Sequence, residues 1–280
     1  MKKAKRLPLI VLIVSIFIVL SKNTTQYIGI NYKIIEYKIP LYLKLYNFYG
    51  RHLNYDHLVN KITQNSKNDI EKVLDISKWI QSNIGKIPKG LDVVDSHPLT
   101  IIERRLGTKD QFSDLLSVLL VYAGVDAFIW FNEDNYKDAV TVFKVNGKWS
   151  TIDPYYGIVF LNNDNKHASI TELKNLDLNK DLFMHNLNYE KIKSDNISLF
   201  FGNKFNNKDD VIGYYARMFD KLPTRKIINN SNVFELGGRS YTQSPLSRLR
   251  FIIYNYLEFN IGLSGYIQNW CAWILKKSMF

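Results

Sequence analysis

Residues 107–114 combine the start of a helix with a lysine that has the means to act as a nucleophile. Lys109 falls in the first turn of that expected helix, where free backbone N–H groups and the helix dipole favour negative charge. A lysine amine attacks a carbonyl carbon only when it is neutral, which requires a site shielded from water. Asp110 is its neighbour in sequence, and a nearby carboxylate favours the charged ammonium. This neighbourhood therefore argues against covalent lysine chemistry.

Two aspartates on later segments, Asp138 and Asp153, offer a second kind of chemistry. A pair of carboxylates roughly 5–10 Å apart can supply the acid and the base of glycoside hydrolysis. The sequence sets no distance between them, so hydrolysis stays an alternative. His97 lies in a loop before the helix and could reach the same cleft, although a loop histidine more often bonds to backbone. Ser113 is expected to turn away from the cleft.

Cofactor and metal sites are not expected. No group of His, Cys, Asp or Glu has the spacing of a zinc or calcium site. The sequence also has no glycine-rich phosphate loop. The single cysteine, Cys271, lies between Trp270 and Trp273 in an apolar tail. A lone cysteine in such surroundings is typical of a buried structural thiol rather than a reactive one.

A capped amphipathic helix is predicted at residues 108–123. Thr108 and Gln111 have the spacing of a capping box, in which the two residues satisfy free N–H groups at a helix start. Apolar residues then recur at helical spacing and form a continuous core-facing stripe. The stripe consists of Phe112, Leu115, Leu116, Leu119, Leu120 and Ala123. An earlier helix is predicted after Asn68, which can cap it together with Glu71.

Short strands are predicted to follow that helix, at residues 125–131, 139–145, 148–152 and 157–161. Asn146-Gly147 separates the second and third of them and is a strong signal for a tight hairpin. A helix followed by antiparallel strands indicates an α+β domain. Before residue 65 the sequence predicts only a lead-in of extended segments and a short helix.

The order of these motifs resembles the transglutaminase-like branch of the papain-type thiol enzymes. Members of that superfamily often have Gly-x-Cys-x-x-Phe at the helix start, and Gly107-x-Lys109-x-x-Phe112 matches all but the cysteine. A His-Ala pair followed by Asn-Gly-x-Trp corresponds here to Asp138-Ala139 and residues 146–149. Asp153-Pro154 matches the third catalytic position. The resemblance implies a core at residues 65–165 in which a helix packs on a small antiparallel sheet.

The same resemblance implies a degenerate catalytic triad. A thiol enzyme needs a cysteine, a histidine that takes its proton and a carboxylate that orients the histidine. Lys109 and Asp138 stand at the first two positions, and only Asp153 agrees with the family. No thiol-dependent activity is therefore expected. The simplest hypothesis is an ion pair of Lys109 with Asp138 or Asp153 that fills the former site.

The N-terminus has the features of a secretory signal peptide or membrane anchor, at residues 1–21. Four basic residues between positions 2 and 6 precede an apolar run from residue 7 to residue 20. At about 1.5 Å per residue the run is shorter than the roughly 30 Å of a bilayer core. The positive-inside tendency places the rest of the chain outside the cytoplasm. The net charge is +11, but no nucleic-acid motif accompanies it.

Residues 166–280 are predicted to form a mainly helical C-terminal extension packed on the core. Hydrophobic residues make up 46% of the chain, enough for a substantial core. The leading functional hypothesis is a non-catalytic binding or scaffold module at the cell envelope, with a peptide, a glycan or an envelope protein as partner. The alternative is an acyl-transfer enzyme or an amide or glycoside hydrolase that uses Lys109, Asp138 and Asp153.

Overall fold

The structure is a computed structural model, and the chain divides into two compact units, residues 1–222 and residues 223–280. The predictions for Cys271 and for the apolar tail around it lie outside the described residues. The structure describes residues 6–30, 33–88, 91, 97–132, 135–162, 164, 166–175, 183–186, 205, 208–222, 233–236 and 239–242.

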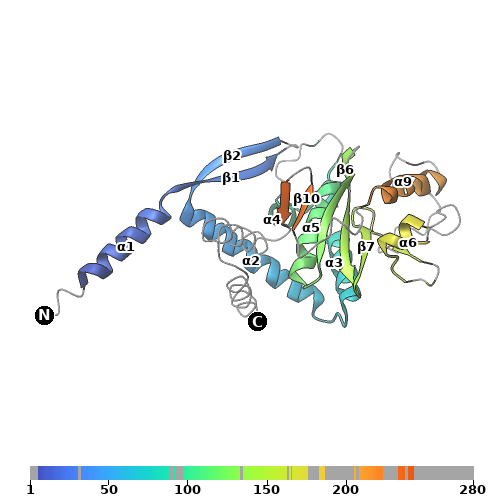
Figure 1. Ribbon diagram of the computed structural model, residues 1–280, viewed down its shortest axis with the longest axis horizontal. Coiled ribbons are helices and arrows are strands. Elements are labelled where there is room, and N and C mark those ends of the chain that lie inside the picture. Colours follow the sequence, from blue (N-terminus) through green and yellow to red (C-terminus); the bar gives the residue numbers. More distant parts are fainter. Residues whose placement is uncertain are drawn as a thin grey trace, which may run out of the picture. The chain divides into compact units, whose positions relative to one another are not determined.

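The first unit begins with an apolar helix and a hairpin (Figure 1). Helix α1 spans Arg6–Leu20, and strands β1 (Asn23–Ile30) and β2 (Lys33–Pro40) pair antiparallel. The hairpin brings the chain back beside the residue that precedes β1. There the N–H of Leu41 donates to the carbonyl of Lys22 at 2.9 Å. Within the described residues, no helix combines the length and the apolar character needed to cross a membrane.

Helix α2 (Leu41–Thr63) is much longer than the short helix expected in this region. It has 23 residues, and its second half buries Tyr55 and Val59 against the core. The sequence obscured it because tyrosines and polar residues interrupt the apolar pattern, and because Pro40 gives no side-chain cap. Tertiary packing of one face therefore stabilises this helix more than local propensity does.

Two further helices lead to the segment that carries Lys109. Helix α3 (Asp69–Asn83) is capped by Asn68, whose side chain accepts from the Glu71 N–H at 2.9 Å, as predicted. Helix α4 (Pro98–Arg104) follows, and Arg105 ends it in the left-handed conformation. The two-residue strands β3 (Gly85–Lys86) and β4 (Leu106–Gly107) pair parallel and align the chain before α5.

Helix α5 (Lys109–Tyr122) is the central helix of the core, and its predicted apolar stripe is confirmed. Phe112, Leu115, Leu116, Leu119 and Leu120 are each at most 1% exposed. They meet α2, α3 and strand residues in one cluster. A continuous stripe at helical spacing explains why this helix lies between the other helices and the sheet (Figure 1).

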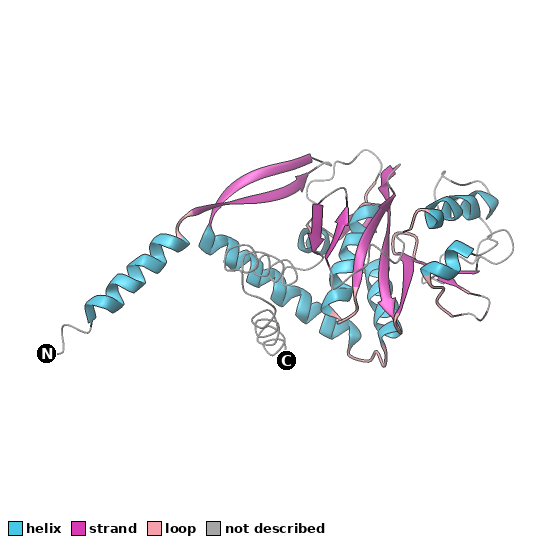
Figure 2. Cartoon of the chain, viewed as in Figure 1, coloured by secondary structure: helices cyan, strands magenta, loops and turns pink. Residues whose placement is uncertain are grey.

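The sheet of the first unit has five antiparallel strands in the order β5-β6-β7-β8-β9. Figure 2 shows the strands in magenta beside the cyan helices. Asn146 and Gly147 have φ angles of 51° and 76°, as the predicted Asn-Gly hairpin between β6 and β7 requires. The four predicted strands are confirmed, and β9 is an additional one. The strands are β5 (Ala127–Asn132), β6 (Asn135–Val145), β7 (Lys148–Asp153), β8 (Ile158–Leu161) and β9 (Phe183–Asn186).

Helices α6 (Ile170–Asn175) and α9 (Lys208–Asp220) complete the described part of the first unit. Val159 of β8 belongs to the core cluster. Its neighbour Phe160 points to the opposite face of the strand. There the Phe160 ring contacts Tyr215 and Phe219 of α9 at centroid distances of 4.9 and 4.8 Å. Helix α9 therefore covers the side of β8 that the core helices leave open.

The second unit contains a described hairpin of strands β10 (Val233–Leu236) and β11 (Arg239–Thr242). In the first unit, a helix packs on a small antiparallel sheet, so the predicted α+β fold is confirmed.

Candidate functional site

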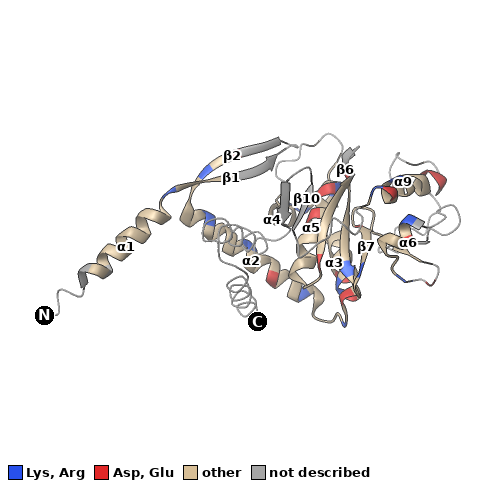
Figure 3. Cartoon of the chain, viewed as in Figure 1, with Lys and Arg blue, Asp and Glu red and all other residues tan. Residues whose placement is uncertain are grey.

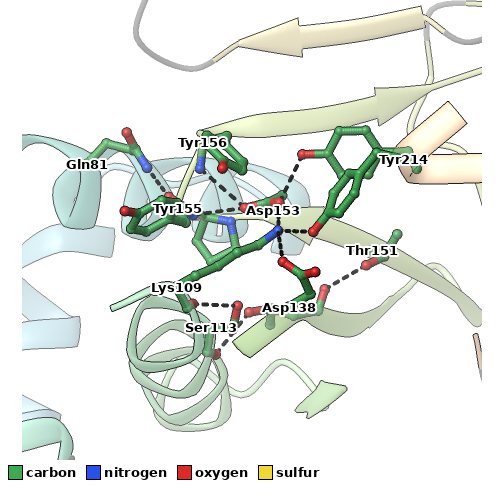
Figure 4. Close-up of polar contacts among 12 residues, drawn as sticks. Gln81, Lys109, Ser113, Asp138, Thr151, Asp153, Tyr155, Tyr156 and Tyr214 are labelled. Atoms are coloured by element: carbon green, nitrogen blue, oxygen red, sulfur yellow. Dashed lines mark hydrogen bonds and ion pairs between the residues drawn. The ribbon is translucent and has the colours of Figure 1, made fainter. Parts of the chain in front are cut away.

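Lys109 is the first residue of α5, and its side chain is buried against Asp138 of β6 and Asp153 of β7 (Figure 4). The residue is 8% exposed. Its Nζ lies 3.0 Å from Oδ2 of Asp153 and 3.8 Å from Oδ1 of Asp138. The predicted ion pair is thus present with both aspartates. A lysine at a helix N-terminus costs about 0.3–1 kcal/mol against the dipole, and two carboxylates this close outweigh that cost.

Asp153 ends strand β7 and is fully buried, with 0% exposure. Its Oδ1 accepts the backbone N–H groups of Tyr155 and Tyr156 at 3.1 and 3.2 Å. Its Oδ2 accepts the hydroxyl of Tyr215 at 2.9 Å, in addition to the Lys109 contact. A carboxylate with four partners tolerates burial. Asp153 therefore fixes the turn after β7 as well as the lysine.

Asp138 lies on β6 and is 7% exposed. It reaches Lys109 from the strand next to Asp153, since β6 and β7 pair antiparallel with Thr141 opposite Ile152. The two carboxylates thus share a single ammonium group. The pairing of the strands brings together residues that the sequence separates by a hairpin.

Two tyrosines of α9 close the site from a distant part of the chain. Lys109 Nζ donates to the Tyr214 hydroxyl at 2.5 Å, across 105 residues of sequence. The Lys109 ammonium also lies 4.8 Å from the ring centre of Tyr214 and 5.1 Å from that of Tyr156. Such cation–π contacts stabilise a charged lysine. Aromatic rings and carboxylates therefore surround this cation.

The tyrosine hydroxyls of the site are held in the neutral form. Burial raises the pKa of Tyr214 above its ordinary value, and the charges of Asp153 and Asp138 raise it further. Burial and the Asp153 charge likewise raise the pKa of Tyr215 and of Tyr156. Neutral phenols can donate hydrogen bonds to carboxylates. The tyrosines therefore contribute no negative charge to the cluster.

Ser113 and two threonines form a buried polar layer below the ion pair. Ser113 Oγ donates to the carbonyl of Lys109 at 3.3 Å, one helical turn earlier. Thr141 Oγ1 donates to the Ser113 carbonyl, and Thr151 Oγ1 donates to the Thr141 carbonyl. The expectation that Ser113 turns away is wrong, because residues four apart share a helix face. It faces β6 together with Lys109, and its hydroxyl is bonded to backbone.

Gln111 serves the helix start, as predicted. Its Oε1 accepts the Thr108 N–H at 3.1 Å and the Arg104 guanidinium at 2.6 Å. The Thr108 hydroxyl donates to Asp110. The polar side chains next to Lys109 in the sequence therefore hold the start of the helix.

His97 is the N-cap of α4, where its Nδ1 accepts the Leu99 N–H at 3.3 Å. That contact is the backbone bond typical of a loop histidine, and a place for His97 in the cleft stays a prediction. In the part of the chain that the structure describes, no three His, Cys, Asp or Glu side chains gather as metal ligands would.

The turn after β7 is also tied to the helical layer. Gln81 of α3 donates to the carbonyl of Pro154, directly after Asp153. Phe112 of α5 packs edge-on against Tyr155 with centroids 5.2 Å apart. The helix that carries Lys109 and the turn that carries Asp153 are therefore joined by contacts beyond the ion pair.

The part of the chain that contains these elements matches a known superfamily. Residues 56–154 match the family model described as the transglutaminase-like superfamily. They form a transglutaminase-like domain. The match begins in α2 and ends directly after Asp153, so it includes all three triad positions. It excludes α9, which supplies the tyrosines that close the site.

The comparison with solved structures gave a weak similarity to a "putative protease" from Parabacteroides distasonis ATCC 8503. That protein is 21% identical over 36% of this chain, with a TM-score of 0.30. The similar region is 23% of the other protein, so this chain spans less than a quarter of its length. No curated protein matches the chain.

Within the transglutaminase-like domain, the three triad positions are in contact although two of them have changed. The cysteine position, Lys109, opens α5, and the histidine position, Asp138, lies on β6, beside the strand that carries Asp153. The resemblance predicted these three residues. It did not predict a role for Tyr214 and Tyr215 of α9, whose burial is also explained by ordinary core packing. The signal available in the sequence was the pair of adjacent tyrosines. A buried tyrosine hydroxyl needs a polar partner, so the pair indicated that α9 packs against polar groups.

Proposed function

We propose that this chain is a non-catalytic transglutaminase-like module that binds a partner or acts as a scaffold at the cell envelope. The observation that supports this best is the buried cation at the family's cysteine position. Lys109 makes close contacts with Asp153, Asp138 and Tyr214 and is 8% exposed. A nucleophile must be neutral and must reach its substrate, and these contacts oppose both conditions.

An acyl-transfer enzyme or an amide or glycoside hydrolase is less well supported. A hydrolytic carboxylate pair needs room for the substrate between its members. Here the ammonium of Lys109 lies within 4 Å of both carboxylates. Asp153 is completely buried and holds the turn and Tyr215. These groups stabilise one another, as the parts of a structural ion-pair network do.

The envelope location in this proposal comes from the N-terminus. Basic residues followed by an apolar run are typical of a signal peptide or anchor that leaves the following domain outside the cytoplasm. The apolar run forms α1. The proposed partner is a peptide, a glycan or an envelope protein, bound at the surface of the domain rather than in the filled site.

Turnover assays test the absence of catalysis. Purified full-length chain and its Lys109→Ala variant would be incubated with peptide amides, glutamine-containing peptides with a free amine, and envelope glycans. We expect neither protein to give turnover. Turnover by the wild type that disappears in Lys109→Ala would show that the lysine is catalytic and that the proposal is wrong.

A restored triad provides a matched comparison. Lys109→Cys with Asp138→His brings back the family's residue types, while Asp153 stays in place. We expect this variant to stay inactive, because Tyr214 and Tyr215 still cover the site. Adding Tyr214→Ala to this variant should expose the thiol at position 109. Iodoacetamide should then label that thiol faster than it labels the native Cys271. Turnover by the restored triad with both tyrosines present would contradict the covered site.

Location is tested separately from catalysis. Alkaline phosphatase, which folds to an active form only after export, would be fused after residue 222. We expect an active fusion, and removal of residues 2–20 should abolish its activity. An inactive fusion, together with activity of a reporter that works only in the cytoplasm, would refute the proposed location and leave the site argument standing.

A further inference from the structure

Helix α2 has two different faces along its length. Its second half buries Tyr55 and Val59 in the core. Its first half presents an apolar stripe at positions i, i+3, i+4, i+7 and i+11, the spacing of one helix face. The stripe comprises Tyr42, Leu45, Tyr46, Tyr49 and Leu53, with exposures of 54, 49, 75, 61 and 49%. Among the described residues, none covers this stripe.

The stripe begins where α1 ends. The Leu41 N–H donates to the Lys22 carbonyl at 2.9 Å, which places the first turn of α2 beside the end of α1. Lys44 Nζ donates to the Thr25 carbonyl at 2.6 Å and ties α2 to strand β1, which follows α1. Helix α1 is itself exposed, with Phe17 at 71% and Val19 at 52%. The exposed apolar residues of α1 and those of α2 therefore approach each other at this junction.

The same face of α2 becomes polar away from α1. Asp56 and Asn60 follow Leu53 at helical spacing on this face. Both are exposed, and the Asn60 amide donates to the Asp56 carboxylate at 3.2 Å. Apolar character is thus confined to the part of the helix nearest α1. If the stripe packed against the protein core, its apolar character would not depend on the distance from α1.

Charge is concentrated in the same region. Nine of the 37 basic residues and one of the 26 acidic residues lie before residue 56, so this fifth of the chain carries +8 of the net +11. The first acidic residue of α2 is Asp56. In Figure 3 the apolar length of α1 has no segment coloured as a charged residue, and the first half of α2 has none coloured as acidic. Such a distribution complements an anionic surface.

We propose that the Tyr42–Leu53 stripe lies in the interface of an anionic lipid membrane, as a second contact beside α1. Tyrosines suit that position because the ring enters the apolar layer while the hydroxyl stays at the headgroups. Polar residues from Asp56 onward then take the helix out of the lipid. The inference rests on the membrane location proposed above, and it specifies which surface of the domain faces the lipid.

A fluorescent probe at two positions of α2 tests the inference. Tyr46→Cys and Asn60→Cys, each combined with Cys271→Ser, would be labelled with NBD in the full chain. Both positions are exposed on one face, about 21 Å apart at 1.5 Å per residue. Each protein would be reconstituted into vesicles of phosphatidylcholine and phosphatidylglycerol, with and without nitroxide on the headgroup-proximal lipid.

The probe at position 46 should shift its emission to shorter wavelength, and nitroxide lipid should quench it at least about two-fold more than the probe at position 60. Aqueous iodide should quench in the opposite order. Equal iodide quenching at both positions would overturn the inference. A position 46 shielded from both quenchers would also overturn it, since a second copy or another segment of the chain would then cover the stripe.

Flotation of the unlabelled chain separates the two proposals. A chain that does not float with these vesicles refutes the membrane location and the stripe together. A chain that floats while position 46 stays accessible to iodide refutes only the stripe. Tyr42→Ser with Tyr46→Ser gives a further measurement, because both side chains are exposed and their loss leaves the core unchanged. This variant should float less than wild type on vesicles made progressively richer in phosphatidylcholine.

Discussion

At the scale of single residues, the site is a buried pair of opposite charges. Lys109 and Asp153 are 8% and 0% exposed, and each needs the other because an unpaired charge is costly away from water. The exchange of Cys and His for Lys and Asp replaces reactive groups with partners that satisfy each other. The same positions that perform chemistry in a thiol enzyme here contribute to the stability of the fold.

Lys109→Met should lower the free energy of unfolding by about 3–5 kcal/mol, because it leaves a buried carboxylate without its cation. The matched control is Lys72→Met, which breaks an exposed pair with Asp69 at 2.9 Å. That change should cost at most about 1 kcal/mol. Urea unfolding of the purified chain measures both. Equal, small losses for the two variants would show that the buried pair has no special role.

A double-mutant cycle isolates the pair itself. Asp153→Asn in the Lys109→Met background should recover part of the lost stability, since the neutral amide no longer needs a cation. The recovery will be incomplete, because Tyr155, Tyr156 and Tyr215 all donate to the carboxylate. Strictly additive effects of the two substitutions would contradict a direct Lys109–Asp153 interaction.

Alkaline pH should destabilise the fold through the buried tyrosines. The pKa values of Tyr214 and Tyr215 are raised by burial and by Asp153, so these phenols stay protonated in the folded state. In the unfolded chain a tyrosine ionises near about pH 10. Above that pH the folded state holds more protons than the unfolded state, and stability falls as pH rises.

The Tyr214→Phe/Tyr215→Phe variant should therefore lose less stability than wild type between about pH 9 and pH 11. Tyr37→Phe, which removes the hydroxyl of a tyrosine that is 43% exposed, is the matched control. Urea unfolding at a series of pH values gives the slopes. The same slope in the tyrosine pair variant and in the control would rule out this explanation.

At the scale of elements, most of the core was predictable and the way α9 closes the site was not. Capping residues and the leucine stripe predicted α5, and Asn146-Gly147 predicted the β6–β7 hairpin. Those signals are local. The length of α2 was missed because one face meets the core over only its second half. The contact of α9 with Lys109 spans 105 residues, and no local pattern encodes such a pairing.

Two glycines test the packing of these elements in opposite directions. A Cβ at Gly107 would lie 3.1 Å from the ring of Phe112, which is itself buried. Gly107→Ala should therefore lower the free energy of unfolding by about 1–3 kcal/mol. A Cβ at Gly50, within α2, would have no atom within 4 Å. Gly50→Ala should raise the free energy of unfolding by about 0.5–1 kcal/mol.

Circular dichroism during urea unfolding measures both glycine variants under one condition. The difference in sign is the decisive result, because the same methyl group is added in each case. A loss of stability for Gly50→Ala would mean that something contacts the first half of α2 in solution. No loss for Gly107→Ala would mean that the helix start accommodates a side chain that the Phe112 contact should exclude.

At the scale of the whole molecule, the family domain and the complete site have different limits in the sequence. The transglutaminase-like match ends at residue 154, whereas the site needs α9, which ends at Asp220. The first compact unit ends at residue 222 and includes both. The resemblance could predict the three triad positions, but it could not predict a closing element outside the family's own boundaries.

Truncations after residues 222 and 207 test where the stable unit ends. The chain 1–222 keeps α9 and should unfold cooperatively at about the wild-type urea midpoint. The chain 1–207 loses Tyr215, Phe219 and Leu222, which are at most 2% exposed. At about 1.5–3 kcal/mol for each large buried side chain, its midpoint should fall sharply. Similar midpoints for the two truncations would show that α9 does not stabilise the core.

The 105-residue separation between Lys109 and Tyr214 also sets the order in which the molecule can mature. Contacts between distant residues form late, because closing a long loop costs entropy before any contact compensates it. Helices α1–α5 and strands β5–β8 are complete by Leu161, about 50 residues before α9 is synthesised. A nascent chain thus passes through a period in which the lysine and both aspartates are in place but still hydrated. We therefore expect α9 to exclude water from the charged site only after these earlier elements have folded.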